Sequence, residues 1–296
     1  MSSSSSKLLF LILPGVLFAG CDDPKPPPVD DSKVVRLVSE GCNTTALGAP
    51  KGFFAQTQVE IGSSTRTYDW MIPEAHNGQA PIPLVFVFGG DLQKGADARA
   101  KYPLEAATAG AAAFVWPDPD TSGRWDIERG GEGNGDVALY DAIRTSLGKS
   151  HCIDINRVFV TGHSRGAYFA NHLGCFRGGS IRALAAHGGG GPTSEDALDF
   201  SERGQLNCPE KPVAAIITHG ADDTEVELKE GQATRDHWGR VNSCRTGGLE
   251  GFDPAPCIQL LNCASDRPVV YCEVPGIGHD LWSLAPRATW SFFDSL

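Results

Sequence analysis

The sequence is short of positive charge. Its 25 Lys and Arg residues face 36 Asp and Glu, which gives a formal net charge of −11 and a pI near 5.1. Proteins that bind nucleic acid draw much of their affinity from clustered Lys and Arg that meet the phosphates. No basic cluster occurs here, so we expect no nucleic-acid partner.

The spacing patterns of zinc sites are also absent. The nine cysteines and eight histidines include no CxxC pair and no HxxxH pair. Structural zinc sites usually place Cys and His ligands at such short spacings. We therefore expect neither a metal site nor a cofactor.

An apolar run at the N-terminus is too short to remain as a membrane span. LLFLILPGVLFAG is broken by Pro14 and ends in small residues before Cys21, which predicts a secretion signal over residues 1–20. Its ending LFAGC resembles the bacterial lipobox, whose cysteine carries lipid after cleavage, although Phe18 replaces the usual Leu. We expect an exported protein. Three forms are open: a lipoprotein that meets the membrane only through lipid on Cys21, a plain secreted protein, or a protein that keeps the segment as an uncleaved anchor.

Eight cysteines remain once Cys21 is set aside, and eight can pair completely. They are Cys42, Cys152, Cys175, Cys208, Cys244, Cys257, Cys263 and Cys272. In an exported chain such a set predicts up to four disulfides, whose connectivity the sequence leaves open. The short separation of Cys263 and Cys272 suggests that these two pair.

The rest of the chain reads as a tether followed by one folded domain. Residues 21–33 contain DDPKPPPVDDSK, which is rich in Pro and charge and has almost nothing to bury, so an extended tether is expected. Residues 34–296 are enough for a sizeable core, and we expect a single domain and a monomer. The GGGG run at 188–191 is expected to be a flexible loop.

Short apolar runs alternate with helical patterns along this domain. The apolar runs are 83–90, 112–120, 157–164, 181–191, 213–223 and 268–279. The helical patterns are 135–148, 165–176, 231–244 and 286–296. This alternation predicts an α/β fold with a mainly parallel sheet and helices on both faces. In such a sheet, functional side chains gather in loops at the carboxyl ends of the strands.

The segment RVFVTGHSRGAYF places Ser164 between a predicted strand and a predicted helix. Gly162 and Gly166 leave room for a sharp turn that pushes the hydroxyl out of the sheet. Because GxSxG alone occurs by chance in a glycine-rich chain, the strand and helix around it carry the argument. They favour a nucleophile over a structural turn serine, with the backbone N–H of Arg165 placed for an oxyanion.

A serine nucleophile needs a base and a carboxylate that orients the base. THGADDTEV supplies Asp222 and Asp223 after a later strand, and GIGHDLW supplies His279 after the next one. The order Ser, acid, His is that of α/β hydrolases. Taken singly, an Asp at this position could also cap a turn, and a His in a glycine loop could be a solvated surface group. The pattern does not choose between the two aspartates.

These segments resemble the secreted polyhydroxybutyrate depolymerases and feruloyl esterases, a group of α/β hydrolases. The matching segments are HCIDINRVFVTGHSRG, HGADD and YCEVPGIGH, with the SEGC, VNSC, LNC and YC cysteines. The likeness spans residues 42–282. It implies an α/β-hydrolase fold stabilised by disulfides. Its catalytic residues would be Ser164 as nucleophile, His279 as base and Asp223, in preference to Asp222, as acid.

The resemblance also implies the remaining parts of the site. Gly90 would supply a second oxyanion N–H beside that of Arg165, although VFVFGGD has Phe88 where the group usually has His. That departure bears on substrate and rate more than on reaction type. GRWDIERGGEGNGD resembles the Trp and Gly-Gly loop of the group, so Trp125 either lines the acyl pocket or packs in the core.

The sequence thus predicts an exported serine esterase whose partner is an ester substrate. Feruloyl or acetyl esters of plant polysaccharide and short hydroxyalkanoate esters both fit, through an acyl-enzyme on Ser164. A serine peptidase fits less well, because this chain has no room for the added domain that such enzymes commonly carry. A catalytically inactive lipoprotein of the same fold that binds glycan or polymer is the third class, which the complete Ser, Asp and His motifs disfavour.

Overall fold

A computed structural model of the chain describes residues 37–42, 48–245 and 249–296. By internal contacts the chain divides into Met1–Val35 and a second unit, Arg36–Leu296, to which every element below belongs. The expected signal segment 1–20, the tether 21–33 and the lipidation candidate Cys21 lie outside the described residues.

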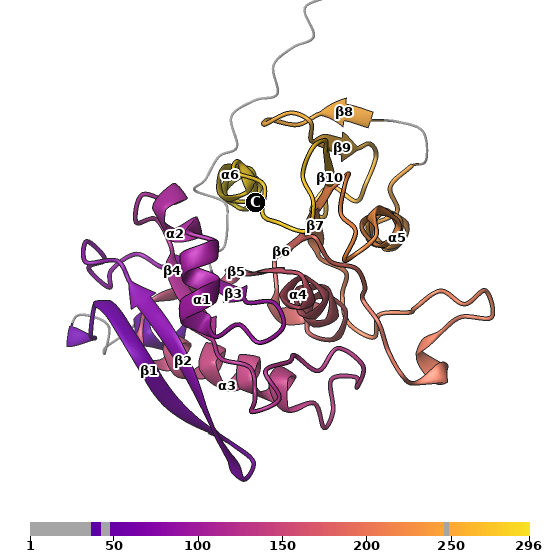
Figure 1. Ribbon diagram of the computed structural model, residues 1–296. Helices are drawn as coiled ribbons and strands as arrows, with labels where there is room; N and C mark the ends of the chain where they lie inside the picture. Colours follow the sequence, from indigo (N-terminus) through magenta and orange to yellow (C-terminus); the bar gives the residue numbers. More distant parts are fainter. Residues whose placement is uncertain (1–36, 43–47, 246–248) are drawn as a thin grey trace, which may run out of the picture. The chain divides into compact units, whose positions relative to one another are not determined.

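One sheet of ten strands runs through this unit in the order β1-β2-β4-β3-β5-β6-β7-β10-β9-β8 (Figure 1). The strands are β1 (Gly52–Ile61), β2 (Ser64–Ile72), β3 (Ile82–Phe88), β4 (Ala113–Pro117), β5 (Ile153–His163), β6 (Ala183–His187), β7 (Ala214–Gly220), β8 (Leu249–Gly251), β9 (Ile258–Leu260) and β10 (Val269–Val274). The six central strands from β4 to β10 run parallel. The outer pairings, at both edges, are antiparallel.

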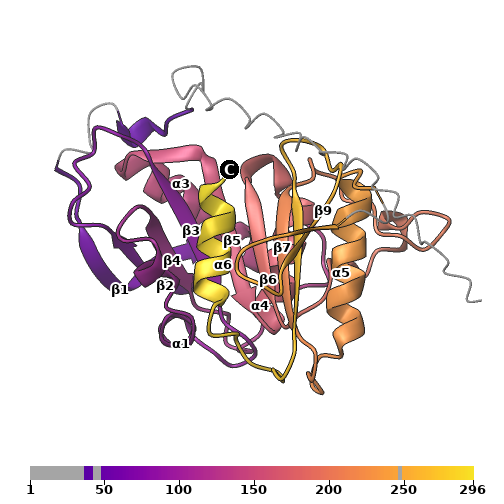
Figure 2. The same ribbon diagram turned by 90° about the horizontal axis from the view of Figure 1, so that it is seen from above.

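Helices cover both faces of the sheet. They are α1 (Gly95–Lys101), α2 (Leu104–Ala107), α3 (Gly135–Ser150), α4 (Arg165–Phe176), α5 (Leu228–Val241) and α6 (Ala285–Asp294), with short 3-10 turns at Glu40–Cys42, Gly178–Ser180 and Ala197–Asp199. Apolar side chains of α3, α4 and α5 share one core with Leu84 and Phe86 of β3. Those of α1, α2 and α6 share a second core with Val85 and Val87, so α6 and α4 lie on opposite sides of the sheet (Figure 2). This confirms the predicted α/β class.

None of the helices in the described residues is both long and apolar enough to cross a membrane.

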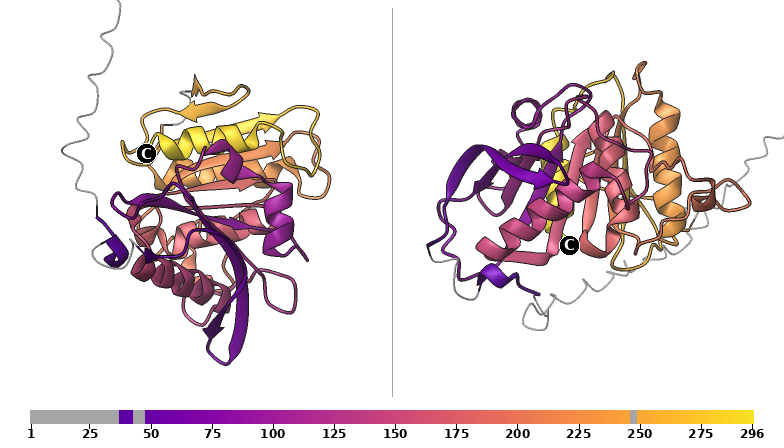
Figure 3. Two further views of the ribbon diagram at one scale, coloured as in Figure 1. Left: turned by 90° about the vertical axis from the view of Figure 1, so that its left-hand side faces the viewer. Right: turned by 90° about the horizontal axis from the view of Figure 1, so that it is seen from below.

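A strand that is buried on both faces has an unbroken apolar sequence. In β3, for example, every residue except the first is buried. The β1–β2 hairpin differs, because along β1 the residues are at most half-buried. It forms one edge of the unit (Figure 3) and has no comparable apolar run, so the sequence did not predict it.

Four disulfides use all eight cysteines of the folded unit. They are Cys42–Cys152, Cys175–Cys208, Cys244–Cys263 and Cys257–Cys272. The expected pairing of Cys263 with Cys272 is therefore wrong. In the antiparallel register of β9 and β10, Ile258 lies opposite Tyr271, which brings Cys257 beside Cys272.

Removing the Cys42–Cys152 disulfide is expected to cost more stability than removing Cys257–Cys272. The first bond joins residues 110 apart and the second joins residues 15 apart. A cross-link restricts the unfolded chain, by about 4.7 kcal/mol for a loop of roughly 100 residues and about 3 kcal/mol for one of about 15. Guanidinium chloride unfolding of the two double-alanine variants measures the order, and a larger loss for the short loop contradicts it.

Candidate active site

Ser164 lies on the sharp turn between β5 and α4. Its backbone has φ 56° and ψ −125°, an unusual conformation for a residue with a side chain. A Cβ on Gly162 would come within 2.4 Å of the Gly166 carbonyl, and one on Gly166 within 2.2 Å of the Phe88 oxygen. Only glycine fits at either position, and this close packing holds the Ser164 side chain out at the carboxyl end of the sheet.

The structure brings Ser164 together with His279 and Asp223. The Oγ of Ser164 lies 2.9 Å from Nε2 of His279, and Nδ1 of His279 lies 2.8 Å from Oδ2 of Asp223. With the ring proton on Nδ1, His279 donates to the carboxylate and accepts from the hydroxyl. Such a chain of contacts can transfer the hydroxyl proton to the imidazole.

The turn after β7 fixes Asp223 and leaves Asp222 outside. The Asp223 side chain is fully buried, and its Oδ1 accepts the backbone N–H groups of Glu225 and Val226, each at 2.9 Å. Burial pushes the pKa of Asp223 up, but the hydrogen bonds from His279 and the two amides outweigh burial and lower that pKa below its usual value. Asp222 is exposed. Of the two candidates, Asp223 alone meets His279.

Two further histidines surround this group, and sequence reasoning gave neither of them a role. His219 donates from Nε2 to the Val226 carbonyl at 2.9 Å and lies 3.5 Å from Oδ2 of Asp223. The ring of His163 lies 4.9 Å from that of His279, and burial lowers the pKa of His163 to about 3, so it is neutral. Their positions in HGADD and GHSRG were the available signal.

The run Gly188–Gly191, expected to be a flexible loop, lies outside any helix or strand and packs closely behind Ser164. A Cβ on Gly189 would come within 2.6 Å of the Ala167 Cβ, and one on Gly188 within 3.6 Å of Oδ2 of Asp223. The run is mostly buried and follows β6 directly. These glycines let the backbone pass between α4 and the Asp223 turn.

Gly90 faces Ser164 closely but its N–H is already engaged. A Cβ on Gly90 would lie 3.2 Å from the Ser164 Cβ, so the backbone after β3 approaches the hydroxyl side of the turn. The N–H of Gly90 donates to Oε1 of Gln93 at 2.8 Å. In the part of the chain that the structure describes, no acceptor takes the N–H of Arg165. Gln93 carried no motif signal and was missed.

Trp125 packs in the core. Only 1% of the residue is exposed, and its ring meets those of Phe88 and Phe169 at 5.1 Å each. Its indole N–H donates to the Gly89 carbonyl at 2.8 Å. Of the two expected roles, burial favours packing over lining an acyl pocket, and the contact steadies the backbone beside Gly90.

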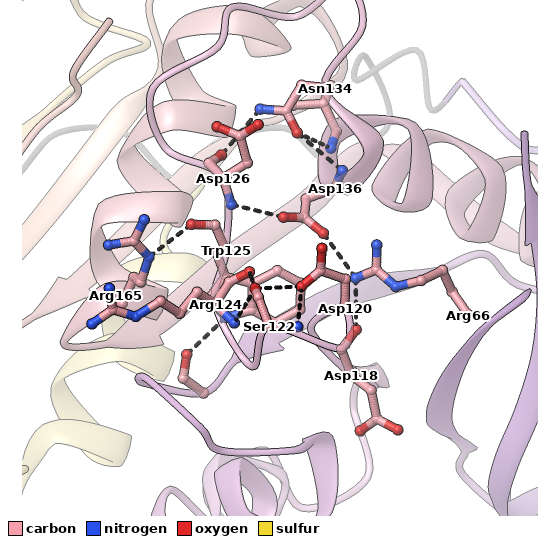
Figure 4. A network of polar contacts seen from close by, with 12 residues as sticks. Arg66, Asp118, Asp120, Ser122, Arg124, Trp125, Asp126, Asn134, Asp136 and Arg165 are labelled. Carbon is pink, nitrogen blue, oxygen red and sulfur yellow. Dashed lines mark hydrogen bonds and ion pairs between the residues drawn. The ribbon is translucent and has the colours of Figure 1, made fainter. Parts of the chain in front are cut away.

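A polar cavity of about 370 Å³ is lined by Trp125 and by Arg165, the residue that follows Ser164. Its charged lining residues are Arg66, Arg124, Arg129, Arg165, Asp120, Asp126, Glu128, Asp136 and Glu195. Figure 4 shows much of this network, in which Arg66 pairs with Asp136 at 2.8 Å. Arg124 also donates to Asp91 at 2.6 Å. Despite these carboxylates, the described residues contain no group of three or more His, Cys, Asp and Glu placed to hold a metal ion.

The sequence is similar to curated fungal esterases. It is 28% identical over 244 residues to a probable feruloyl esterase C of Aspergillus niger, and the alignment covers 77% of this chain and 83% of that protein. It is 28% identical over 261 residues to feruloyl esterase D of Neurospora crassa, covering 79% and 83%. No protein-family model matches the chain.

Solved structures share the fold. An acetyl xylan esterase from Aspergillus awamori superimposes with a TM-score of 0.63 at 15% identity, over 81% of this chain and 100% of that one. A ferulic acid esterase from Anaeromyces mucronatus, in complex with ferulic acid, gives 0.54 at 16% identity, over 83% and 90%. With a mainly parallel sheet covered on both faces, the chain has the α/β-hydrolase fold, is similar to the feruloyl esterases and is a carboxylic ester hydrolase.

Proposed function

We propose that Ser164, His279 and Asp223 form the catalytic triad of a serine esterase. One observation carries the proposal: the 2.9 Å and 2.8 Å contacts link nucleophile, base and acid in a single chain. The strained turn at Ser164 and the buried carboxylate of Asp223 support it.

The reaction proceeds through an acyl-enzyme. His279 takes the proton of Ser164 through Nε2 while Oγ attacks the ester carbonyl, and the N–H groups of Gly90 and Arg165 hold the oxyanion. The tetrahedral intermediate collapses, and the alcohol leaves with the proton from His279. Water then attacks the acyl-enzyme with His279 again as base, which releases the acid and restores Ser164. Asp223 keeps the ring in the productive tautomer and stabilises the imidazolium.

The substrate is a feruloyl or acetyl ester of plant polysaccharide. The names of the similar proteins support the acyl groups, and the charged cavity supports the sugar. Its ion pairs offer donors and acceptors to hydroxyl groups, and its one aromatic lining residue, Trp125, is buried. A hydroxyalkanoate polyester, the other candidate, has few groups to use such a lining.

The protein works outside the cytoplasm as a monomer. Four disulfides form and persist in oxidising compartments, which supports export. The LFAGC sequence supports anchoring through lipid on Cys21, with plain secretion as the alternative.

Labelling with a fluorophosphonate probe tests the nucleophile. The wild-type protein should be labelled and the Ser164→Ala variant should not, since the probe phosphonylates an activated serine. An unlabelled wild-type protein supports the inactive, glycan-binding lipoprotein. A labelled protein that cleaves peptides and no ester supports the peptidase.

The sugar assignment predicts a change in substrate preference. In an Arg129→Ala/Glu195→Ala variant, we expect the kcat/KM for feruloyl arabinose, relative to that for methyl ferulate, to fall about 10-fold, because hydrogen bonds from charged groups to hydroxyls are lost. Both side chains line the cavity, and neither contacts the triad. Arg287→Ala, at an exposed ion pair with Asp253, is the matched control. An unchanged ratio in the double variant contradicts the sugar assignment.

A further inference from the structure

The segment that follows β3 folds back on its own first amide. Gly90 to Gln93 form a turn closed by the Gln93 N–H, which donates to the Gly90 carbonyl at 3.1 Å. The Gln93 side chain then returns to the same residue, and its Oε1 accepts the Gly90 N–H at 2.8 Å. Because an N–H needs an acceptor, the amide must present its oxygen here, not its NH₂ group.

This contact occupies an N–H that the proposed reaction needs as a free donor to the oxyanion. Gly90 approaches Ser164 so closely that a Cβ on it would be 3.2 Å from the Ser164 Cβ. That same point is 3.5 Å from Oε1 of Gln93. The glutamine oxygen therefore accepts an N–H whose residue packs against the nucleophile, and this is the N–H that the proposed mechanism assigns to the oxyanion.

The two donors of the proposed oxyanion hole differ in this respect. Arg165 is the first residue of α4, where N–H groups lack partners within the helix, and its amide has no acceptor among the described residues. The Gly90 amide has one. A substrate carbonyl can thus meet the Arg165 N–H at once, whereas the Gly90 N–H must first lose Gln93.

We propose that Gln93 Oε1 is an internal competitor for the oxyanion hole, which the substrate carbonyl oxygen displaces on binding. The inference rests on the proposed triad and on Gly90 as an oxyanion donor. A side-chain rotation of Gln93 suffices for displacement, since the backbone turn is held separately by the Gln93 N–H and by the Leu92 N–H, which donates to Gly123 at 2.8 Å. Gln93 is half-buried, so its amide has a route to solvent.

If the substrate displaces Gln93 when it binds, Gln93 weakens substrate binding and does not slow the chemical step. Its hydrogen bond is lost before the carbonyl reacts, so the ground state and the transition state bear the same cost. Removing the competitor should therefore lower KM and leave kcat nearly unchanged. The net strength of one hydrogen bond sets the size of the decrease in KM, a factor of about 2 to 10.

Three variants at this position test the proposal. Gln93→Ala removes the side chain, Gln93→Met keeps its length without an acceptor, and Gln93→Glu replaces the amide oxygen with a charged one. We expect KM for methyl ferulate to fall about 2- to 10-fold in the first two, with kcat within a factor of about two. In Gln93→Glu, KM should rise at least about 10-fold, because a carboxylate accepts the Gly90 N–H more strongly.

A boronic acid that adds to the serine provides a readout free of substrate identity. Its inhibition constant should shift with KM across the three variants, since its boronate oxygen needs the same N–H. Loss of kcat in both Gln93→Ala and Gln93→Met, or an unchanged KM in both, overturns the proposal and makes Gln93 a support of the turn. Failure of the triad itself would show differently, as activity that persists in Ser164→Ala.

Discussion

Replacing Ser164 with Ala should lower kcat for ester hydrolysis by about 10⁴-fold or more and leave the fold intact. The hydroxyl forms the covalent bond to the acyl group, and Ser164 supplies the hydroxyl that His279 Nε2 meets, at 2.9 Å. Residual turnover would come from oxyanion binding alone. Ser164 is only partly buried and one oxygen is removed, so the free energy of unfolding should change by less than about 1 kcal/mol.

Steady-state kinetics on methyl ferulate and p-nitrophenyl acetate measure this loss, and circular dichroism melting checks the fold. Ser150→Ala is a suitable control, since Ser150 ends α3 and bonds only within that helix end and to His151. The control should keep the wild-type kcat. A Ser164→Ala variant that retains more than about a tenth of kcat contradicts the nucleophile assignment.

The central part of the fold was predictable because it is buried on both faces. The residues of β3, of β7 and of β5 from Val158 onward are mostly apolar and almost all buried, a composition typical of a parallel strand covered on both faces. The α4 helix begins and ends at the residues predicted, because the glycine turn at Ser164 fixes its start. Burial on both faces therefore makes these segments recognisable by their apolar composition.

The edges of the sheet gave no such signal. In β8 and β9, three residues each pair antiparallel in a partly solvated hairpin, where polar and apolar side chains serve equally well. The disulfides followed this geometry, since the β9–β10 register paired Cys257 with Cys272. Sequence separation alone could not supply that register.

The site was predictable in its motifs and not in its surroundings. Ser164 and His279 follow strands whose ends meet at one edge of the sheet, so their convergence follows from topology. Gln93, the buried Gly188–Gly191 run and the position of Trp125 depend on how loops pack against one another. Such contacts join residues far apart in sequence or turn on one rotamer, and no short pattern records them.

The choice between adjacent aspartates leads to the second large effect, expected for Asp223→Asn. The asparagine keeps the size of the side chain and an oxygen that can still accept from Glu225 and Val226, so the turn should persist. It loses the charge that faces Nδ1 of His279 at 2.8 Å. An amide NH₂ directed at Nδ1 favours the tautomer with the proton on Nε2, which cannot accept from Ser164.

We therefore expect kcat for Asp223→Asn to fall by about 10⁴ with the fold unchanged. Asp222→Asn provides the matched control, because it makes the same chemical change one residue away. Asp222 is exposed, and its backbone N–H bond to Ile277 does not depend on the side chain, so kcat should stay within a factor of about two. Kinetics of both variants at neutral pH, with melting curves as a check on folding, measure the contrast. A large loss in Asp222→Asn beside a near-normal Asp223→Asn would reverse the assignment of the acid, while similar losses in both would point to the turn and not to either carboxylate.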